Sequence, residues 1–199
     1  NSTLAVVKAL IDKTIFEEYY LQHDRVHFEG KVKEKALQLS SAQELAFQEI
    51  EKSFNSKEVC LLHGVTSSGK TEIYIQLIER YLKQEKQILY LLPEIALTTQ
   101  LVGRLREYFG NKVAVFHSKY NNNERVEVWK QVLENSPKAQ IVIGARSALF
   151  LPFSNLGLII IDEEHEQTFK QQDPAPRYHA RDAAVILASL HQSTRANGE

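Results

Sequence analysis

Short apolar runs alternate with segments of helical spacing along most of this chain. Mainly hydrophobic runs, typical of buried strands, occupy 59–62, 87–92, 113–116, 140–144 and 158–161. Around them, apolar residues recur every three or four positions over 41–53, 73–82, 94–109, 121–134 and 178–191. Because parallel strands need helical crossovers, this alternation predicts an α/β fold: a mostly parallel sheet with helices on both faces.

The predicted helices carry end signals and expected buried faces. Ser40 or Ser41 is a good N-cap for helix 41–53, and Glu44 lies three residues after Ser41, as in a capping box. Pro93 can open helix 94–109, which Gly110 stops. The residues expected to face the core are Leu45, Ala46, Phe47 and Ile50 in helix 41–53 and Val126, Trp129, Val132 and Leu133 in helix 121–134.

The pattern changes near residue 35. Residues 4–22 have the spacing of an amphipathic helix, and 26–33 alternate like a short strand or extended arm. We expect 1–35 to be a linker or the remnant of a preceding domain, and 36–199 to form the α/β unit. The chain contains no methionine. This favours either a fragment of a longer protein or the loss of methionine-derived residues from the sequence, and both alternatives stay open.

The amino-acid composition mainly excludes certain classes of protein and kinds of site. The net charge is −1, from 24 basic and 25 acidic residues, so binding to nucleic acid must come from a local surface. No run approaches the roughly 18 apolar residues of a membrane span, and no signal-peptide pattern is present. Cys60 is the single cysteine, which excludes an internal disulfide and a cysteine-rich zinc site; we expect it to be a small buried hydrophobe. This charge balance, together with the single cysteine and the lack of long apolar runs, is typical of a cytoplasmic protein, and we expect no membrane partner.

One stretch carries recognisable chemistry. Residues 64–71 read Gly-Val-Thr-Ser-Ser-Gly-Lys-Thr, which fits the phosphate-loop pattern G-x-x-x-x-G-K-T. A predicted strand precedes it and a predicted helix follows it, unlike an ordinary Gly/Ser-rich turn. The glycines let backbone amides turn toward phosphate oxygens, and the helix start adds unpaired N–H groups and a positive dipole end. The predicted nucleotide contacts are Gly64, Thr66, Ser67, Ser68, Gly69, Lys70 and Thr71, with Lys70 on the outer phosphates and Thr71 as a Mg²⁺ ligand.

An acidic motif follows the last predicted strand. Asp162-Glu163-Glu164-His165 comes directly after run 158–161. Since the C-terminal ends of parallel strands face the ligand crevice, Asp162 and Glu163 should lie beside the phosphate loop. Asp162 suits Mg²⁺, held through its water shell, and Glu163 suits the activation of an attacking water. By itself the motif is equally consistent with a charged turn; beside a phosphate loop it indicates nucleotide hydrolysis.

Together the two motifs resemble the pairing found in superfamily 2 helicases. Further stretches, at 91–98, 116–118, 143–150 and 178–182, are similar to the primosomal replication-restart DNA helicases (primosomal protein N′). The resemblance covers about residues 36–190. It implies a RecA-like P-loop lobe and a 3′ to 5′ DNA translocase that uses ATP and Mg²⁺. Its implied partners are single-stranded and forked DNA and the primosome and replication-restart proteins.

Some residue roles come only with that resemblance. It makes Gln43 an adenine contact, because 39–43 resemble the family's glutamine motif, and it gives His165 a part in coupling nucleotide state to DNA. It also places 91–99 and 144–147 along a single-stranded DNA track, with Thr98, Arg146 and Ser147 as contacts. From the residues alone, Gln43 reads as a solvated first-turn residue and His165 as an ordinary surface or core histidine.

Aromatic and basic residues interleave in the polar loop 167–181. Aromatic rings can stack on unpaired bases while cations hold phosphates. This predicts DNA contacts by Phe169, Lys170, Arg177 and Tyr178. The alternative is that the aromatic rings anchor a surface loop to the core.

The chain also lacks parts of the family pattern. It has no G-S/T-A-T-P stretch, no second RecA-like lobe and no cysteine-rich zinc insertion, so zinc is expected only in the remainder of a full-length protein. We expect 36–199 to be a first motor lobe, incomplete at its C-terminal end and nearly inactive alone. The alternatives are a small P-loop kinase, which the acidic motif and residues 91–98 disfavour, and a DNA-binding ATP switch that does not unwind.

Overall fold

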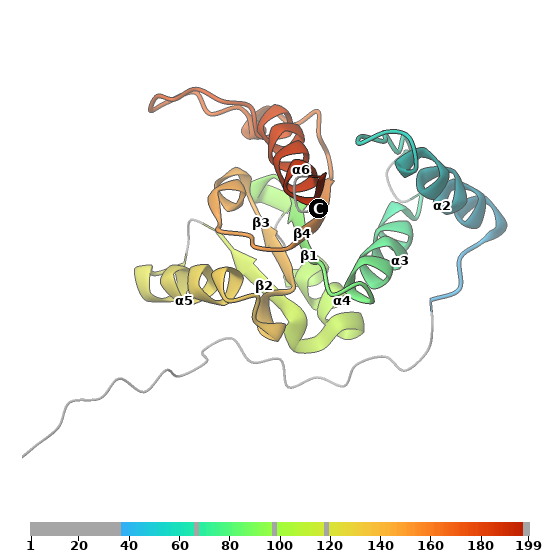
Figure 1. The fold of residues 1–199 in the computed structure, drawn as a ribbon, viewed down its shortest axis with the longest axis horizontal. Helices are drawn as coiled ribbons and strands as arrows, with labels where there is room; N and C mark the ends of the chain where they lie inside the picture. The colour runs from blue at the N-terminus through green and yellow to red at the C-terminus, as the bar shows by residue number, and fades with distance from the viewer. Residues whose placement is uncertain (1–36, 66–67, 97–98, 118–119, 197–199) are drawn as a thin grey trace, which may run out of the picture.

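The computed structural model describes residues 37–65, 68–96, 99–117 and 120–196. In this part of the chain, four parallel strands form one sheet in the order β2-β3-β1-β4 (Figure 1). The strands are β1 (Gln87–Leu91), β2 (Val113–Phe116), β3 (Ile141–Gly144) and β4 (Leu156–Ile161). The α-helices are α2 (Ser41–Phe54), α3 (Lys70–Leu82), α4 (Thr99–Phe109), α5 (Asn122–Leu133) and α6 (Ala180–Ala196). The predicted parallel α/β fold is confirmed, while the interpretation of 1–35 lies outside the described residues.

The hydrophobic core has two layers, one on each face of the sheet, and the side chains of β1 alternate between them. All five residues of β1 are buried. Ile88 and Tyr90 pack with side chains of α2, α3 and α4, whereas Leu89 and Leu91 pack with side chains of α5 and α6. This follows from the two-residue period of a strand, which sends successive side chains to opposite faces. Figure 1 shows the result: α5 and α6 cover one face of the sheet, and α3 and α4 cover the other.

Helix α2 begins with a capping box, but with different partners from those predicted. Ser40 is the N-cap, and its Oγ accepts a hydrogen bond from the backbone N–H of Gln43 at 3.4 Å. The Gln43 Oε1 accepts from the backbone N–H of Ser40 at 2.8 Å. Because the N-cap is Ser40, the third helical residue is Gln43 and not Glu44. The expected pairing of Ser41 with Glu44 is therefore wrong.

Two helix starts also differ from the sequence prediction. The segment 94–109 does not form one helix: a 3₁₀ turn, η1 (Glu94–Ala96), comes first and α4 starts at Thr99. Its predicted end is confirmed, since Gly110 has a φ of 58°, a left-handed conformation that glycine adopts easily. The last helix starts at Ala180, two residues after the expected start at Tyr178.

The predicted inward faces of two helices are partly wrong. In α2, Ile50 is buried but Leu45 is 59% exposed. In α5, Val128 and Val132 are buried, one turn apart, and they alone of the helix pack in the core. Val126, Trp129 and Leu133 are 52%, 43% and 47% exposed. Both sets have helical spacing, so periodicity could not decide which stripe faces the sheet.

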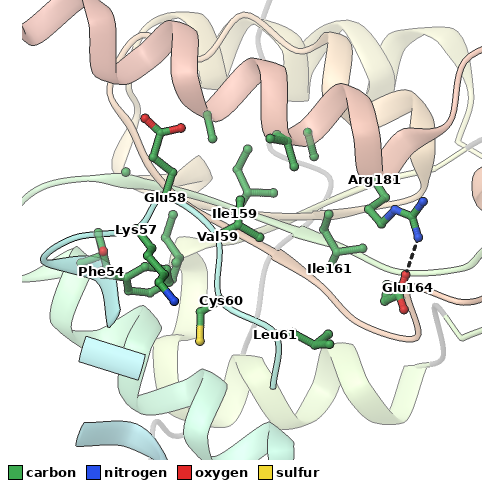
Figure 2. A pocket seen from close by; sticks show the side chains of 16 residues that line it. Phe54, Lys57, Glu58, Val59, Cys60, Leu61, Ile159, Ile161, Glu164 and Arg181 are labelled. Atoms are coloured by element: carbon green, nitrogen blue, oxygen red, sulfur yellow. Dashed lines mark hydrogen bonds and ion pairs between the residues drawn. The ribbon is translucent and has the colours of Figure 1, made fainter. Parts of the chain in front are cut away.

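Residues 59–62 are not a buried strand, contrary to the prediction. Val59 is 55% and Leu61 is 74% exposed, and Cys60 is half-buried. Figure 2 shows this segment along one side of a pocket, with β4 and α6 forming the other sides. The cavity volume is about 430 Å³. A strand needs a hydrogen-bonded neighbour, and β4, whose described pairing is with β1, is separated from this segment by the pocket.

Candidate nucleotide-binding site

The loop that ends at Gly69 leads directly into α3. Gly69 is the N-cap of this helix with a φ of 82°, and Lys70 and Thr71 are the first two helical residues. The Lys70 Nζ donates to the carbonyl oxygens of Gly64 at 2.6 Å and Val65 at 3.2 Å. The ammonium group therefore lies over the backbone of the loop, as a phosphate-binding lysine must. Ser68 is exposed at the same loop, and the expected contacts Thr66 and Ser67 lie outside the described residues.

Gln43 connects α2 to this loop. Its Nε2 donates to the Gly69 carbonyl oxygen at 3.1 Å while its Oε1 completes the capping box. A Cβ added at Gly69 would lie 2.2 Å from Gln43 Nε2. Gln43 is thus not a freely solvated residue, because its amide holds the loop next to the start of α3. Its contact with adenine stays a prediction.

Replacing Gly69 with alanine is expected to weaken both folding and nucleotide binding. The left-handed backbone conformation costs a non-glycine residue about 1 kcal/mol or more, and the new Cβ would also displace the Gln43 amide. We expect a loss of about 1–3 kcal/mol in the free energy of unfolding, measured by urea denaturation. Nucleotide affinity, measured by calorimetry, should fall as well.

Gly103→Ala is the matched control. Gly103 lies inside α4, and nothing lies within 4 Å of an added Cβ. Alanine there should raise the free energy of unfolding by about 0.5–1 kcal/mol and leave nucleotide affinity unchanged. Equal effects of the two substitutions would contradict the assigned role of Gly69.

The acidic motif lies at the C-terminal end of β4, as predicted. The backbone N–H of Asp162 donates to Leu91 of β1 at 3.1 Å, which continues the sheet pairing. The Asp162 Oδ1 accepts the Glu163 backbone N–H at 3.1 Å, and its Oδ2 accepts the Tyr90 hydroxyl at 3.1 Å. Glu163 is exposed and has a φ of 52°, a conformation that costs a non-glycine residue energy and is often found at functional sites.

The sequence interpretation did not single out two buried tyrosines, Tyr74 and Tyr90, that lie near Asp162. Burial, followed by the negative charge of Asp162, raises the pKa of Tyr90 well above its usual value. Burial and the same charge raise the pKa of Tyr74. Both phenols therefore keep their protons, and the hydroxyl of Tyr90 donates to the carboxylate. The available signal was Tyr90 itself: a hydroxyl within an apolar central strand needs a buried partner.

The residues expected to hold Mg²⁺ fit that ion. Thr71 is the second residue of α3, Asp162 follows the last residue of β4, and α3 packs against β4. Among the described residues, no group of three or more His, Cys, Asp or Glu side chains could hold a metal by itself. Mg²⁺ suits such a sparse protein donor set, because it retains several waters and takes further oxygens from nucleotide phosphates.

The other two residues of the acidic motif face different surroundings. Glu164 Oε2 pairs with Arg181 of α6 at 2.9 Å (Figure 2), and Arg181 Nε also contacts Asp182 at 3.1 Å. Hydrogen bonds to these two carboxylates raise the pKa of Arg181. His165 is exposed. Its proposed coupling role stays a prediction.

The loop 167–181, called the aromatic loop below, is bridged between its two ends and hydrogen-bonded to the 3₁₀ helix η4 (Arg146–Phe150). An antiparallel bridge pairs Lys170 with His179. The Arg146 guanidinium donates to the carbonyl oxygens of Thr168 at 3.2 Å and Lys170 at 2.9 Å. The structure thus brings together Arg146, Lys170 and Tyr178, whose hydroxyl lies 3.5 Å from the Arg146 carbonyl oxygen. Arg177 is exposed beside them and Ser147 is half-buried, while Thr98 lies outside the described residues.

For Phe169, the expected stacking on DNA is wrong in this structure. The side chain is 1% exposed and packs in the core under α6. A ring enclosed by apolar neighbours offers no face to a base, so Phe169 anchors the loop. Phe150, which the sequence interpretation did not single out, is 66% exposed and contacts Tyr178 edge-to-face, with ring centroids 5.2 Å apart. Phe150 therefore presents an exposed ring next to the half-buried Tyr178.

Comparison with known proteins agrees with this site. The family model for the DEAD/DEAH box helicase matches residues 40–192. The chain belongs to the DEAD/DEAH box helicase family. The matched residues include the phosphate loop, the acidic motif and the aromatic loop. In the described residues, no helix is both long and apolar enough to cross a membrane.

Curated relatives share the name "Replication restart protein PriA". The protein of Bacillus subtilis is 44% identical over 195 residues, covering 96% of this chain and 24% of its own length. The Haemophilus influenzae protein is 45% identical, covering 92% of this chain and 26% of its own length. The Synechocystis protein is 49% identical, and the match covers 79% of this chain and 19% of that protein's length. The chain therefore spans about a quarter of the length of the first two.

Proposed function

We propose that this chain is the ATP-binding lobe of a DNA helicase that acts in replication restart. ATP and Mg²⁺ bind at Lys70, Thr71 and Asp162, and Glu163 activates the attacking water. The full-length protein moves 3′ to 5′ on DNA, binds single-stranded and forked DNA, assembles with primosome and replication-restart proteins and works in the cytoplasm.

The observation that carries the proposal is the joining of the phosphate loop to the acidic motif. Tyr90 of β1 donates to the Asp162 carboxylate, and the ring of Tyr74 in α3 contacts the ring of Tyr90, so the helix that starts at Lys70 is connected to the end of β4. Family membership and the replication-restart name of several relatives support the rest. A kinase finds no comparable support.

The direct test is ATP turnover by the full-length protein with and without single-stranded DNA. We expect DNA to stimulate turnover, and Lys70→Ala to remove the activity together with most of the ATP affinity. Equal ATP affinity in wild type and Lys70→Ala would contradict the assignment of the nucleotide site to the Lys70 loop. Turnover that is indifferent to DNA but responds to a small acceptor molecule would favour a kinase.

Phe150 and Phe169 should separate DNA coupling from folding. Phe169→Ala empties a core position and should lower the free energy of unfolding by about 3–5 kcal/mol, measured by denaturant titration. Phe150→Ala removes an exposed ring, so its folding cost should be within about 0.5 kcal/mol. Instead it should reduce DNA-stimulated turnover more than basal turnover. A Phe150→Ala protein with full DNA stimulation would show that the exposed Phe150 ring does not couple DNA to turnover.

A further inference from the structure

One of the two hydrogen bonds on the Asp162 carboxylate comes from the buried core of the sheet. Tyr90 is the fourth of the five residues of β1, is 0% exposed and donates to Asp162 Oδ2 at 3.1 Å. The backbone N–H of Glu163 donates to Oδ1 at 3.1 Å. Each carboxylate oxygen thus has a fixed donor, and rotation of the carboxylate about its axis would break both bonds.

Tyr74 extends this arrangement to α3. It lies three residues after Thr71, and residues three apart share a face of a helix. The rings of Tyr74 and Tyr90 meet edge-to-face, with centroids 5.7 Å apart and planes at 77°. Burial, followed by the negative charge of Asp162, raises the pKa of Tyr74, so its phenol also lies within electrostatic reach of the carboxylate. A buried tyrosine pair therefore joins the element that carries Thr71 to the residue at the end of β4.

We propose that Tyr90 and Tyr74 are positioning residues that orient the Asp162 carboxylate toward the water shell of Mg²⁺. The inference rests on the proposed nucleotide site, in which Asp162 and Thr71 hold the ion. A carboxylate at the edge of an apolar sheet has lost part of its hydration, and the Tyr90 hydroxyl replaces a missing donor while the ring of Tyr74 holds Tyr90 in place. They also fix one rotamer of Asp162, so that the side chain is already in place when the nucleotide arrives.

The test uses Tyr90→Phe and Tyr74→Phe in the full-length protein, because phenylalanine keeps the ring and removes only the donor. ADP is the probe, and its affinity is measured by calorimetry in Mg²⁺ and in EDTA. Tyr90→Phe should weaken ADP binding in Mg²⁺ by about tenfold and leave binding in EDTA unchanged, since residues behind a metal ligand typically matter on that scale. The Mg²⁺ concentration for half-maximal ATP turnover should rise by a similar factor. Since both phenols act on one carboxylate, the double variant should lose less than the product of the single losses.

Tyr81→Phe is the matched control. Tyr81 lies on α3 seven residues after Tyr74 and also packs at the core, so it reports what the loss of a hydroxyl from this helix does in general. Its ADP affinity should be the same as wild type in both media. A Tyr90→Phe protein that melts at a lower temperature but keeps the wild-type dependence on Mg²⁺ would overturn the inference, and so would an equal loss in Tyr81→Phe. If wild type binds no ADP, or binds it equally in Mg²⁺ and EDTA, the proposed site fails, and this inference with it.

Discussion

The 199-residue chain by itself is expected to turn over ATP about 10³- to 10⁵-fold more slowly than the full-length protein, the range attributed to an arginine finger. In the proposed site, Lys70 and Mg²⁺ would place positive charge on one side of the transferring phosphoryl group, and Glu163 would activate the attacking water. Charge that builds on its oxygens needs a cation from the other side. Three arginines close to the site or to the loops beside it already have partners: Arg104 with Glu72, Arg146 with two carbonyl oxygens, and Arg181 with Glu164.

Steady-state turnover with saturating single-stranded DNA checks this expectation. The chain and the full-length protein are compared at equal concentration, and ADP binding by the chain confirms that its site is folded. The chain should also fail to unwind a forked duplex, because translocation requires two lobes that close and open around the nucleotide. Comparable rates in the two proteins would point instead to a self-sufficient P-loop enzyme.

Glu163→Gln is expected to lower the turnover number of the full-length protein by about 10²- to 10⁴-fold, the usual contribution of a general base. Glutamine has the same shape and can still orient a water molecule, but it cannot accept the proton. ATP affinity should change little, because the Asp162 carboxylate and the Lys70 ammonium are untouched. The measurement is single-turnover hydrolysis beside an equilibrium titration with ATP.

Glu164→Gln is the neighbouring control. Its carboxylate pairs with Arg181 on a half-exposed surface, with side-chain exposures of 37% and 49%, and such pairs contribute about 0–1 kcal/mol to stability. Turnover should stay close to wild type. If Glu164→Gln were as inactive as Glu163→Gln, or if Glu163→Gln lost ATP binding, the base would not be Glu163.

Local patterns allowed much of the fold to be predicted. The four strands of the described sheet were predicted within one or two residues of their bounds, because fully apolar runs between helices have few other stable arrangements. The phosphate loop and the acidic motif were also predictable, since each has a short pattern with fixed chemistry. The place of the acidic motif at the C-terminal edge of the sheet followed from a general rule, that strand ends in a parallel sheet point to one edge.

Contacts between distant segments could not be predicted in this way. Ser40 and Ser41 are equally good caps, and the hydrogen bond from Gln43 to Gly69 accompanies the choice of Ser40. Residues 59–62 have a strand-like composition, but a strand also needs a neighbour, and β4 lies across a pocket from them.

In this protein, short local patterns were enough to predict the candidate chemistry, a lysine loop and a carboxylate pair, together with the order of the strands and helices that contain them. Tertiary structure decided which of several equivalent side chains faces which environment. It buried Phe169 and exposed Phe150, turned Val128 inward and Trp129 outward, and placed the Tyr90 hydroxyl on Asp162. The physical reason is that periodicity fixes the spacing of a face but not its direction. Direction depends on what packs opposite, and those partners lie tens of residues away in the chain.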